Sequence, residues 1–223
     1  MRKIAVIAEP GVFDAWGAAM LLGEAMGLQA HNVGDLCRAA VQGATAWGWR
    51  FANHMQAGEL VPDEVLGEFV ADTLAGSPGC WLLFGYPRTI RHAELLAEHG
   101  HAPDTVIQVM LDEGRVDQDW RLAAKRDQIP QILAEHRLRI APVRVFYHAS
   151  DTFHVVQQPA SVEDLVAELQ AIVSVARPSD PRRCTDLPRS ARSADAVIPV
   201  GRALRETLVA AGGYCVTGVP EVP

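Results

Sequence analysis

Cysteine and long apolar segments are both scarce in this sequence. Its four cysteines form neither a C-x-x-C pair nor a cysteine–histidine cluster with zinc spacing: Cys37, Cys80, Cys184 and Cys215. We therefore expect free thiols in a reducing compartment, with no disulfide and no structural metal. No apolar run reaches the roughly 18 residues that a membrane helix needs, and the run at residues 4–8 is too short for the core of a signal peptide. These absences predict a cytoplasmic protein that does not enter a membrane.

Excess positive charge is absent as well. The chain has 20 lysines and arginines against 27 aspartates and glutamates, a formal net charge of -7, and the arginines cluster only late in the sequence. Because a nucleic-acid backbone is held by a broad basic surface, we expect no DNA or RNA partner. The 223 residues, of which 49% are hydrophobic, suffice for one globular domain with a sizeable core and leave no room for a second full domain.

Short apolar runs alternate with segments of helical periodicity over most of the chain. The run at residues 4–8 is rich in β-branched residues and ends at Glu9-Pro10-Gly11, which is typical of a central strand in a parallel sheet. Similar runs predict strands at 81–84, 105–110 and 152–156. Helices are predicted at 15–26, 33–42, 46–56, 63–74, 91–99 and 161–175. A further helix is predicted at 116–126, which breaks before Pro130 and resumes to about residue 141. This alternation predicts an α/β fold with a doubly wound parallel sheet.

The end of the chain differs in composition from the rest. Residues 177–192 are rich in proline, serine, aspartate and arginine, which cannot build a core, and we assign residues 177–196 to a linker. Residues 197–223 have room for one short amphipathic helix, which is too little to fold alone. We therefore predict a domain at residues 1–176 and a C-terminal docking segment, which packs on the domain or joins a second copy as a homo-oligomer.

Four short motifs occur along the domain. In order they are the Pro-Gly turn at 10–11, GDLCR at 34–38, GELVPD at 58–63 and GYPRT at 85–89. With these motifs in this order and spacing, the sequence resembles adenylate kinases over about residues 1–175. The resemblance implies the fold of nucleoside monophosphate kinases, with a reduced lid because the stretch between Met110 and Pro142 is short.

The resemblance also implies which residues border a nucleoside monophosphate. Arg38 and Arg88 would face its phosphate, since two guanidinium groups offer fixed, bidentate donors to an anion. The other ligand-binding positions are Gly85, Tyr86, Leu60 and Val61, with Tyr86 in the Gly-aromatic-Pro-Arg-Thr turn and the remaining three beside the base. An alternative for Arg38 stays open, because Asp35 lies three residues before it and the two side chains could form an ion pair on a helix surface.

The stretch that would bind a triphosphate departs from the family pattern. A phosphate-binding loop uses glycines, a lysine and a serine or threonine hydroxyl to hold phosphates and magnesium. In this chain Phe13 replaces a glycine, Asp14 stands at the lysine position and Trp16 at the hydroxyl position. Phe84 stands where the family places an acid that helps to organise magnesium. Because a carboxylate repels polyphosphate, we expect no ATP binding and no other cofactor.

Asp14 lies at the centre of the altered loop and has two interpretations. As the residue before a helix, it could cap the helix N-terminus. Alternatively, the apolar side chains of Phe13, Trp16 and Phe84 could shift its pKa and make it a general acid or base. His92 stands where the family usually has a glutamine that reads adenine. It could bond a base, act as an acid or base, or be a surface histidine.

These residues leave three hypotheses for the function. The first is a kinase-like binding protein that has lost ATP-dependent phosphoryl transfer and holds an anionic or amphipathic small molecule, with a nucleoside monophosphate as one candidate. The second is a biosynthetic enzyme repurposed from this fold for isomerase, cyclase or lyase chemistry, with Asp14 and His92 as acid and base. The third is a diverged nucleotide kinase. A ligand that bridges Arg88 and Asp14 would favour the enzyme over the binding protein.

Overall fold

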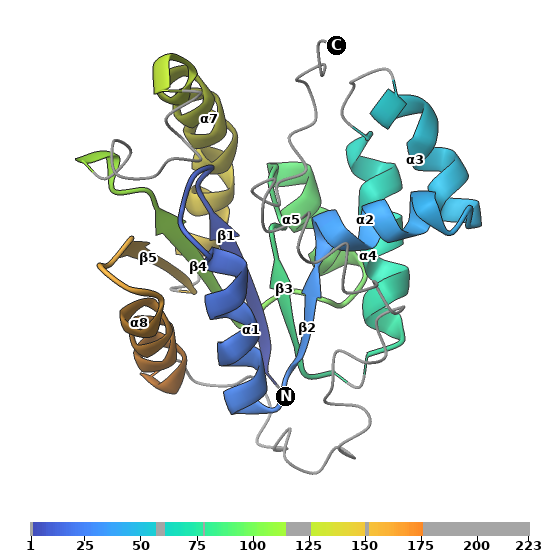
Figure 1. Ribbon diagram of the computed structural model, residues 1–223. Helices are drawn as coiled ribbons and strands as arrows, with labels where there is room; N and C mark the ends of the chain where they lie inside the picture. Colours follow the sequence, from blue (N-terminus) through green and yellow to red (C-terminus); the bar gives the residue numbers. More distant parts are fainter. Residues whose placement is uncertain (1, 57–60, 78, 115–125, 150–151, 176–223) are drawn as a thin grey trace.

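The computed structural model describes residues 2–56, 61–77, 79–114, 126–149 and 152–175. Within them the chain forms a parallel sheet with the strand order β2-β3-β1-β4-β5 (Figure 1). The strands are β1 (Lys3–Ala8), β2 (Gln29–Asn32), β3 (Trp81–Phe84), β4 (Thr105–Met110) and β5 (Phe153–Gln157). This order, with β1 in the centre, confirms the predicted α/β fold with a doubly wound parallel sheet.

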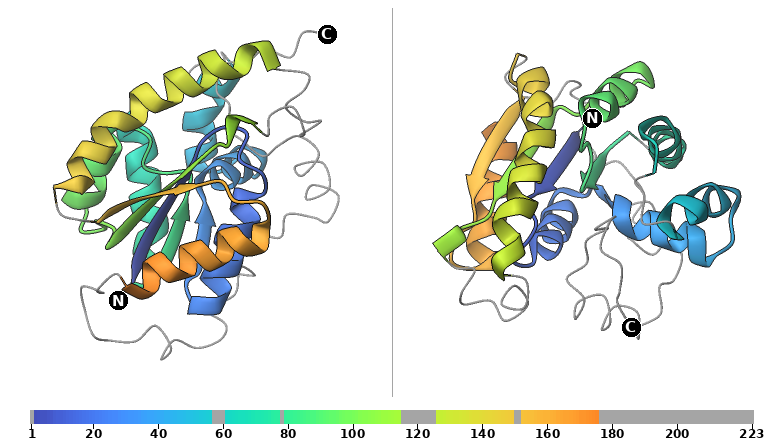
Figure 2. Two further views of the ribbon diagram at one scale, coloured as in Figure 1. Left: turned by 90° about the vertical axis from the view of Figure 1, so that its left-hand side faces the viewer. Right: turned by 90° about the horizontal axis from the view of Figure 1, so that it is seen from above.

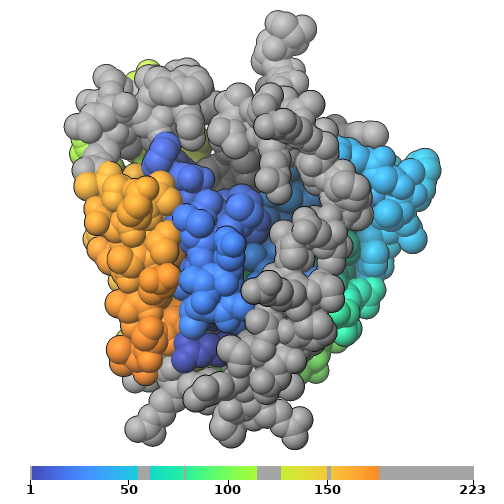
Figure 3. Space-filling view, turned by 60° about the horizontal axis from the view of Figure 1, so that its bottom comes forward, coloured from blue at the N-terminus to red at the C-terminus, as the bar shows by residue number. Residues whose placement is uncertain are grey.

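Helices cover both faces of the sheet. They are α1 (Ala15–Met26), α2 (Val33–Gln42), α3 (Ala46–Gln56), α4 (Asp63–Ala75), α5 (Ile90–Glu98), α7 (Ile129–His148) and α8 (Val162–Val175), with a 3₁₀ turn at Arg126–Gln128. Helices α1 and α8 lie side by side on one face, whereas α5 and α7 cover the other (Figures 2 and 3). Helices α2, α3 and α4 pack with β3 in a separate hydrophobic cluster, here called the α2–α4 cluster.

The central strand β1 is buried on both faces. Ile4 and Val6 pack with α1 and α8, whereas Ala5 and Ile7 pack with α5 and α7. Side chains alternate in this way because successive residues of a strand point to opposite faces. A strand that is covered on both sides has no solvated face, which explains why it is a continuous apolar run in the sequence.

Strand β2 was not predicted. Its sequence, Gln-Ala-His-Asn, neither alternates nor forms an apolar run. It is a four-residue strand at the edge of the sheet, and β3 is its one partner strand within the described residues. A short edge strand depends on that pairing rather than on its own sequence preference, so no local pattern identifies it.

Helix α7 differs from its prediction at its end. It begins at Ile129, directly after the 3₁₀ turn, and it runs to His148, so the end near residue 141 is wrong. Pro130 lies in the first turn, where the N–H that it lacks needs no partner. Pro142 is inside the helix, and the buried side chains of Ile140 and Val143 pack α7 onto the sheet around it. Apart from Arg126, the helix predicted at 116–126 lies outside the described residues, as do the linker and the C-terminal segment.

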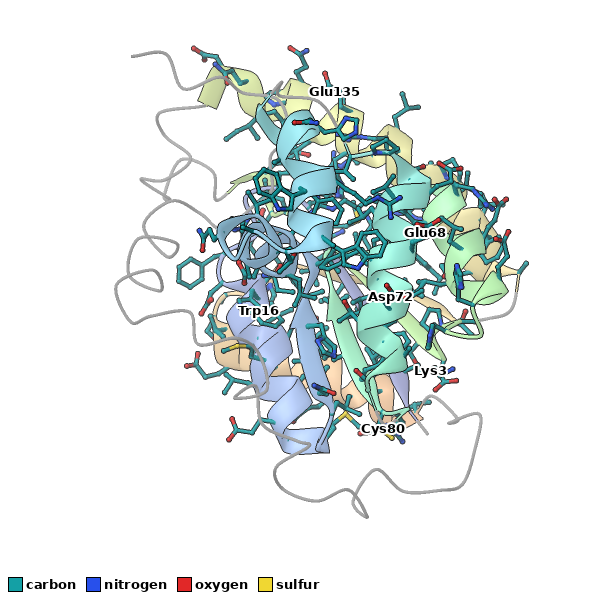
Figure 4. The ribbon with its side chains drawn as sticks, turned by 90° about the vertical axis from the view of Figure 1, so that its right-hand side faces the viewer. Lys3, Trp16, Glu68, Asp72, Cys80 and Glu135 are labelled. Atoms are coloured by element: carbon teal, nitrogen blue, oxygen red, sulfur yellow. The ribbon has the colours of Figure 1, made fainter. Side chains whose placement is uncertain are left out.

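Two of the four cysteines lie within the described residues. Cys37 is a buried thiol. Cys80 is also buried and lies at the same end of the sheet as Lys3 (Figure 4), while Cys184 and Cys215 lie outside the described residues. No described helix is long and apolar enough to cross a membrane.

His31 on β2 is a buried histidine with one unsatisfied nitrogen. Its Nε2 lies 3.1 Å from Oγ of Ser77, whereas Nδ1 is buried without a hydrogen-bond partner among the described residues. Burial lowers the pKa of His31 from 6.5 to about 4, because the charged imidazolium would lose its hydration. The folded protein therefore keeps His31 neutral at pH values where the unfolded chain binds a proton.

We expect the free energy of unfolding to fall as the pH drops from 6.5 to about 4, with a contribution from His31 of up to about 3 kcal/mol. Above the unfolded pKa neither state is protonated, so there the stability is fully present. Urea unfolding between about pH 7 and pH 4.5 should give a flatter profile for the His31→Gln variant. The exposed His99→Gln change should keep the wild-type profile. Equal slopes for the wild type and His31→Gln would contradict the prediction.

Candidate functional site

The segments that follow β1, β2 and β3 meet at the carboxyl edge of the sheet. Strands β1, β2 and β3 are parallel neighbours, and Val6 and Asn32 both lie opposite Phe84. The backbone N–H of Gly85 donates to the carbonyl of Val6 at 2.9 Å, which fixes the chain after β3 against β1. The β1–α1 loop, the start of α2 and the turn at residues 85–89 therefore lie beside one another (Figure 1). Ligands bind at this edge in doubly wound folds.

Asp14 caps helix α1 in a left-handed backbone conformation. Its φ and ψ are 40° and 35°, and its Oδ1 accepts a hydrogen bond from the N–H of Gly17 at 3.2 Å. A Cβ on Gly17 would come within 2.5 Å of the Asp14 carboxylate oxygens, so the carboxylate lies directly over the start of the helix. This geometry confirms the interpretation of Asp14 as an N-cap. The negative charge also suits the positive end of the helix dipole.

Glu9, the first residue after β1, carries a buried carboxylate that is paired with Arg137 of α7. Arg137 donates from Nε to Oε1 at 2.7 Å and from Nη2 to Oε2 at 2.9 Å, and the N–H of Leu111 also donates to Oε2 at 2.9 Å. Burial alone would raise the pKa of Glu9, but these hydrogen bonds outweigh it and hold the pKa below its usual value. Arg137 also donates to Glu113 at 2.8 Å, so two of the protein's own acids share its guanidinium.

The predicted apolar residues of the loop do not form one surface. Trp16 and Phe84 pack together, with ring centroids 5.4 Å apart. Phe84 is buried and Val12 is part of the core, whereas Phe13 is 45% exposed. The structure therefore places the indole of Trp16 between α1 and the end of β3, and it leaves Phe13 at the surface.

Arg38 lies in α2, close to the capped N-terminus of the helix. Asn32 accepts from the N–H groups of Gly34 and Asp35 at 3.0 and 3.3 Å. Arg38 donates to Asp35, so the ion pair considered from the sequence does form. The guanidinium lies over Gly34, where a Cβ would come within 3.4 Å of Nη1. Its Nε is buried and has no hydrogen-bond partner among the described residues, so one donor of this cation is unsatisfied.

Arg88 lies in the turn at residues 85–89, which has a cis peptide bond between Tyr86 and Pro87. Gly85 has a φ of 78°, a conformation that side chains rarely adopt, and a Cβ there would come 3.4 Å from Nη2 of Arg88. The Nε of Arg88 donates to the carbonyl of Gly85 at 2.8 Å. The arginine side chain therefore folds back over its own turn.

His92 is buried beneath this turn. Its Nδ1 accepts from the backbone N–H of Arg88 at 3.2 Å, and its Nε2 lies 3.1 Å from Oδ1 of Asp63. Its ring stacks on Tyr86, with centroids 4.4 Å apart, and Tyr86 is itself fully buried in the α2–α4 cluster. The interpretation of His92 as a surface histidine is therefore wrong, because both ring nitrogens face groups of the protein.

Two further side chains lie near these groups. Val61 is half-buried and packs against the α2–α4 cluster, while Leu60 lies outside the described residues. His136 of α7 has a buried Nδ1 without a hydrogen-bond partner among the described residues. Its pKa is lowered to about 4, first by burial and next by the positive charge of Arg88. Helix α7 thus brings a neutral histidine toward Arg88.

No group of three or more His, Cys, Asp or Glu within the described ranges could hold a metal ion.

The roles of Glu9, Arg137, Asp63 and His136 were missed from the sequence. Glu9 had a usable signal, because a carboxylate that directly follows a buried strand needs a partner if it is buried with that strand. No local pattern identifies Arg137 as that partner, since 128 residues separate the two. The contact between Asp63 and His92 likewise depends on where α4 and α5 meet.

Comparison with known proteins gives consistent matches. A family model described as adenylate kinase matches residues 14–152. The adenylate kinase of Mesorhizobium japonicum is 30% identical over 194 residues, which cover 78% of this chain and 98% of that protein. The adenylate kinase of Chelativorans sp. is 29% identical over 195 residues, which cover 78% of this chain and 100% of that protein. Together with the strand order and the four motifs, these matches show that the chain belongs to the adenylate kinase family.

Proposed function

We propose that the protein binds a nucleoside monophosphate through Arg38 and Arg88 and does not transfer a phosphoryl group from ATP. The proposal is carried by a contrast between two places where an anion would bind. At the start of α1 the carboxylate of Asp14 accepts the N–H of Gly17, so an internal anion holds that donor. Near the start of α2 the buried Nε of Arg38 has no partner in the described part of the chain. That donor is left for an external anion.

The β1–α1 loop supports the exclusion of a triphosphate. Asp14 and Trp16 stand at the positions where a phosphate-binding loop has its lysine and its hydroxyl. A phosphate charge about 4 Å from the Asp14 carboxylate would be repelled by roughly 4 kcal/mol at an effective dielectric near 20. Trp16 also packs on Phe84, so an indole fills space beside the loop. The family-model match begins at residue 14, after the first part of this loop.

The opposite side of the edge supports a monophosphate. Arg38 and Arg88 come from neighbouring connections, and guanidinium groups bind phosphate through charge-assisted hydrogen bonds. Leaving a buried N–H without a partner costs about 1–3 kcal/mol, which a phosphate oxygen at Arg38 would recover. The relatives bear the name adenylate kinase, and that name favours an adenine nucleotide as the ligand.

A diverged nucleotide kinase is the second candidate, and the comparisons favour it. A protein named for that activity matches this chain over 98% of its length. For this candidate a cation other than the usual lysine must neutralise the transferred phosphate. Arg137 is already bound to Glu9 and Glu113, which leaves it poorly placed for that task. The hypothesis of an acid–base enzyme stays a prediction, with Asp14 now seen as a helix cap.

The Arg88→Ala variant should bind AMP about tenfold to a hundredfold more weakly, because a charge-assisted hydrogen bond contributes roughly 1.5–3 kcal/mol. Isothermal titration calorimetry measures the affinity, with adenosine as the probe that lacks a phosphate. The matched control is Arg50→Ala, which removes an exposed guanidinium paired with Glu68 and should leave the affinity unchanged. No AMP binding by the wild type, or equal affinities for wild type and Arg88→Ala, would overturn the proposal.

A further inference from the structure

One hydrogen bond and one close polar contact connect α4 to the backbone of Arg88. Asp63 is the first residue of α4, and its Oδ1 lies 3.1 Å from Nε2 of His92 in α5. The Nδ1 of His92 accepts from the backbone N–H of Arg88 at 3.2 Å. His92 is only 4% exposed, so water has little access to either nitrogen. We call these three residues the Asp63–His92–Arg88 bridge.

Thr89 and Tyr86 hold the bridge in place. The hydroxyl of Thr89 donates to Oδ2 of Asp63 at 2.8 Å, and it accepts from the N–H of His92 at 3.1 Å, which caps α5. The ring of Tyr86 stacks on the imidazole. The close approach of His92 is the largest influence that holds the pKa of Asp63 below its usual value, although burial opposes it. Asp63 is therefore a carboxylate at neutral pH.

The two ends of the bridge determine where the imidazole carries its proton. The backbone N–H of Arg88 is a donor, so Nδ1 must be the unprotonated nitrogen. The remaining nitrogen, Nε2, lies 3.1 Å from Oδ1 of Asp63, although the two atoms do not meet hydrogen-bond geometry. Because Nδ1 is held by the Arg88 backbone and Nε2 lies against a carboxylate, the imidazole acts as a spacer between Asp63 and the Arg88 backbone.

We infer that Asp63 and His92 are positioning residues for the phosphate contact of Arg88, an inference that rests on the proposed binding of a nucleoside monophosphate. His92 fixes the backbone of Arg88, while the carbonyl of Gly85 holds its Nε. A free arginine side chain carries roughly 2 kcal/mol of rotamer entropy. Fixing it before the ligand arrives removes part of that loss from the binding step.

The bridge also relates the two guanidinium groups to each other. Asp63 begins α4, and Arg38 lies in α2. Both helices contribute to the α2–α4 cluster, through side chains such as Phe69 and Cys37. The position of Arg88 is therefore tied to the same packed unit that carries Arg38. A single phosphate can engage both arginines only if their separation is fixed, and the bridge provides that constraint.

Two substitutions of His92 each remove one of its two contacts in the bridge. His92→Asn keeps an oxygen acceptor near the position of Nδ1 but does not reach Asp63. His92→Gln keeps a donor near the position of Nε2 but leaves the N–H of Arg88 without an acceptor. We expect AMP affinity about threefold weaker for His92→Asn and about tenfold weaker for His92→Gln, measured by calorimetry. The same ratios with UMP would separate an effect on the phosphate from a new contact with adenine.

The decisive measurement combines His92→Gln with Arg88→Ala. If His92 acts through Arg88, the double variant binds AMP as weakly as Arg88→Ala alone, within about twofold. Losses that multiply would overturn the inference, as would an equal loss of adenosine affinity. The matched control is Arg50→Ala, which removes an exposed guanidinium paired with Glu68 of α4 and should leave AMP affinity unchanged. If Arg88→Ala alone has no effect on AMP, the proposed function itself fails, and that result is distinct from a failure of coupling.

Discussion

Replacing Arg137 by alanine should destabilise the protein by about 3 kcal/mol, which corresponds to a fall of roughly 6–12 °C in the melting temperature. Glu9 is 0% exposed, and its two hydrogen bonds to Arg137 are the charge-neutralising contacts of a buried carboxylate. Without Arg137 that charge keeps the N–H of Leu111 but loses two charge-assisted hydrogen bonds. Thermal and urea unfolding at neutral pH measure the effect.

The matched control for this prediction is Arg50→Ala. The pair of Arg50 with Glu68 is exposed on both sides, so its loss should change stability by less than about 0.5 kcal/mol.

The pH dependence of stability provides a second test of the Arg137 prediction. In the wild type the pKa of Glu9 is lowered, so its stabilisation is present above the ordinary value of 4.5 and is lost as the pH falls through the folded value. In Arg137→Ala burial should raise that pKa, so the deficit should shrink below about pH 5. A deficit no larger than that of Arg50→Ala would refute the prediction.

Incubation with ATP, magnesium and AMP should give no ADP above background, at least about a thousandfold below the roughly 1–100 per second of kinases. The reason is that one missing preorganised donor lowers turnover by about a hundredfold to a thousandfold, and here both the lysine and the hydroxyl are replaced, by Asp14 and Trp16. A coupled assay for ADP measures the rate. The adenylate kinase of Mesorhizobium japonicum, run in parallel, is the positive control.

Restoring the loop tests the same reasoning in the other direction. Asp14→Lys alone should not revive turnover, because Phe13 and Trp16 still replace the glycine and the hydroxyl. Asp14→Asn should leave AMP affinity and the fold nearly unchanged, since asparagine caps helices about as well as aspartate. A wild-type rate within about tenfold of the relative would favour the diverged kinase. That result would overturn the claim that phosphoryl transfer is lost. The role of Arg88 in binding AMP would still be decided by calorimetry on Arg88→Ala.

The sequence was sufficient for the parts of the fold that depend on local pattern. β1 and β3 contain continuous apolar runs because they are buried on both faces, and such runs are visible without a structure. β2 is held mainly by its pairing with β3, so Gln-Ala-His-Asn carries no strand signal. Pro142 favours a helix end near residue 141, whereas the packing of Ile140 and Val143 on the sheet accompanies a helix that continues to His148.

The residues of the candidate site also fall into those that a local sequence pattern identifies and those that depend on tertiary packing. Arg38 and Arg88 belong to short contiguous motifs, and Asp14 precedes a helix, so each could be singled out from its neighbours in sequence. The partner of Glu9 could not, because Arg137 reaches it only through the packing of α7 across the sheet. The burial of His92 also depends on that tertiary arrangement. A histidine next to Arg91 looks solvated until Asp63 and Tyr86 are placed around it.

The carboxylate on the N-terminus of α1 is covalently part of the helix that it caps. A group tethered by so short a segment acts at an effective concentration in the millimolar range or above, so a dilute anion in solution competes poorly for the same donor. We therefore expect the occupancy of this position not to follow the concentration of nucleotides around the protein. Under the proposed function, Asp14 keeps the first loop in one state at all nucleotide concentrations, and only α2 and the turn that carries Arg88 respond to the ligand.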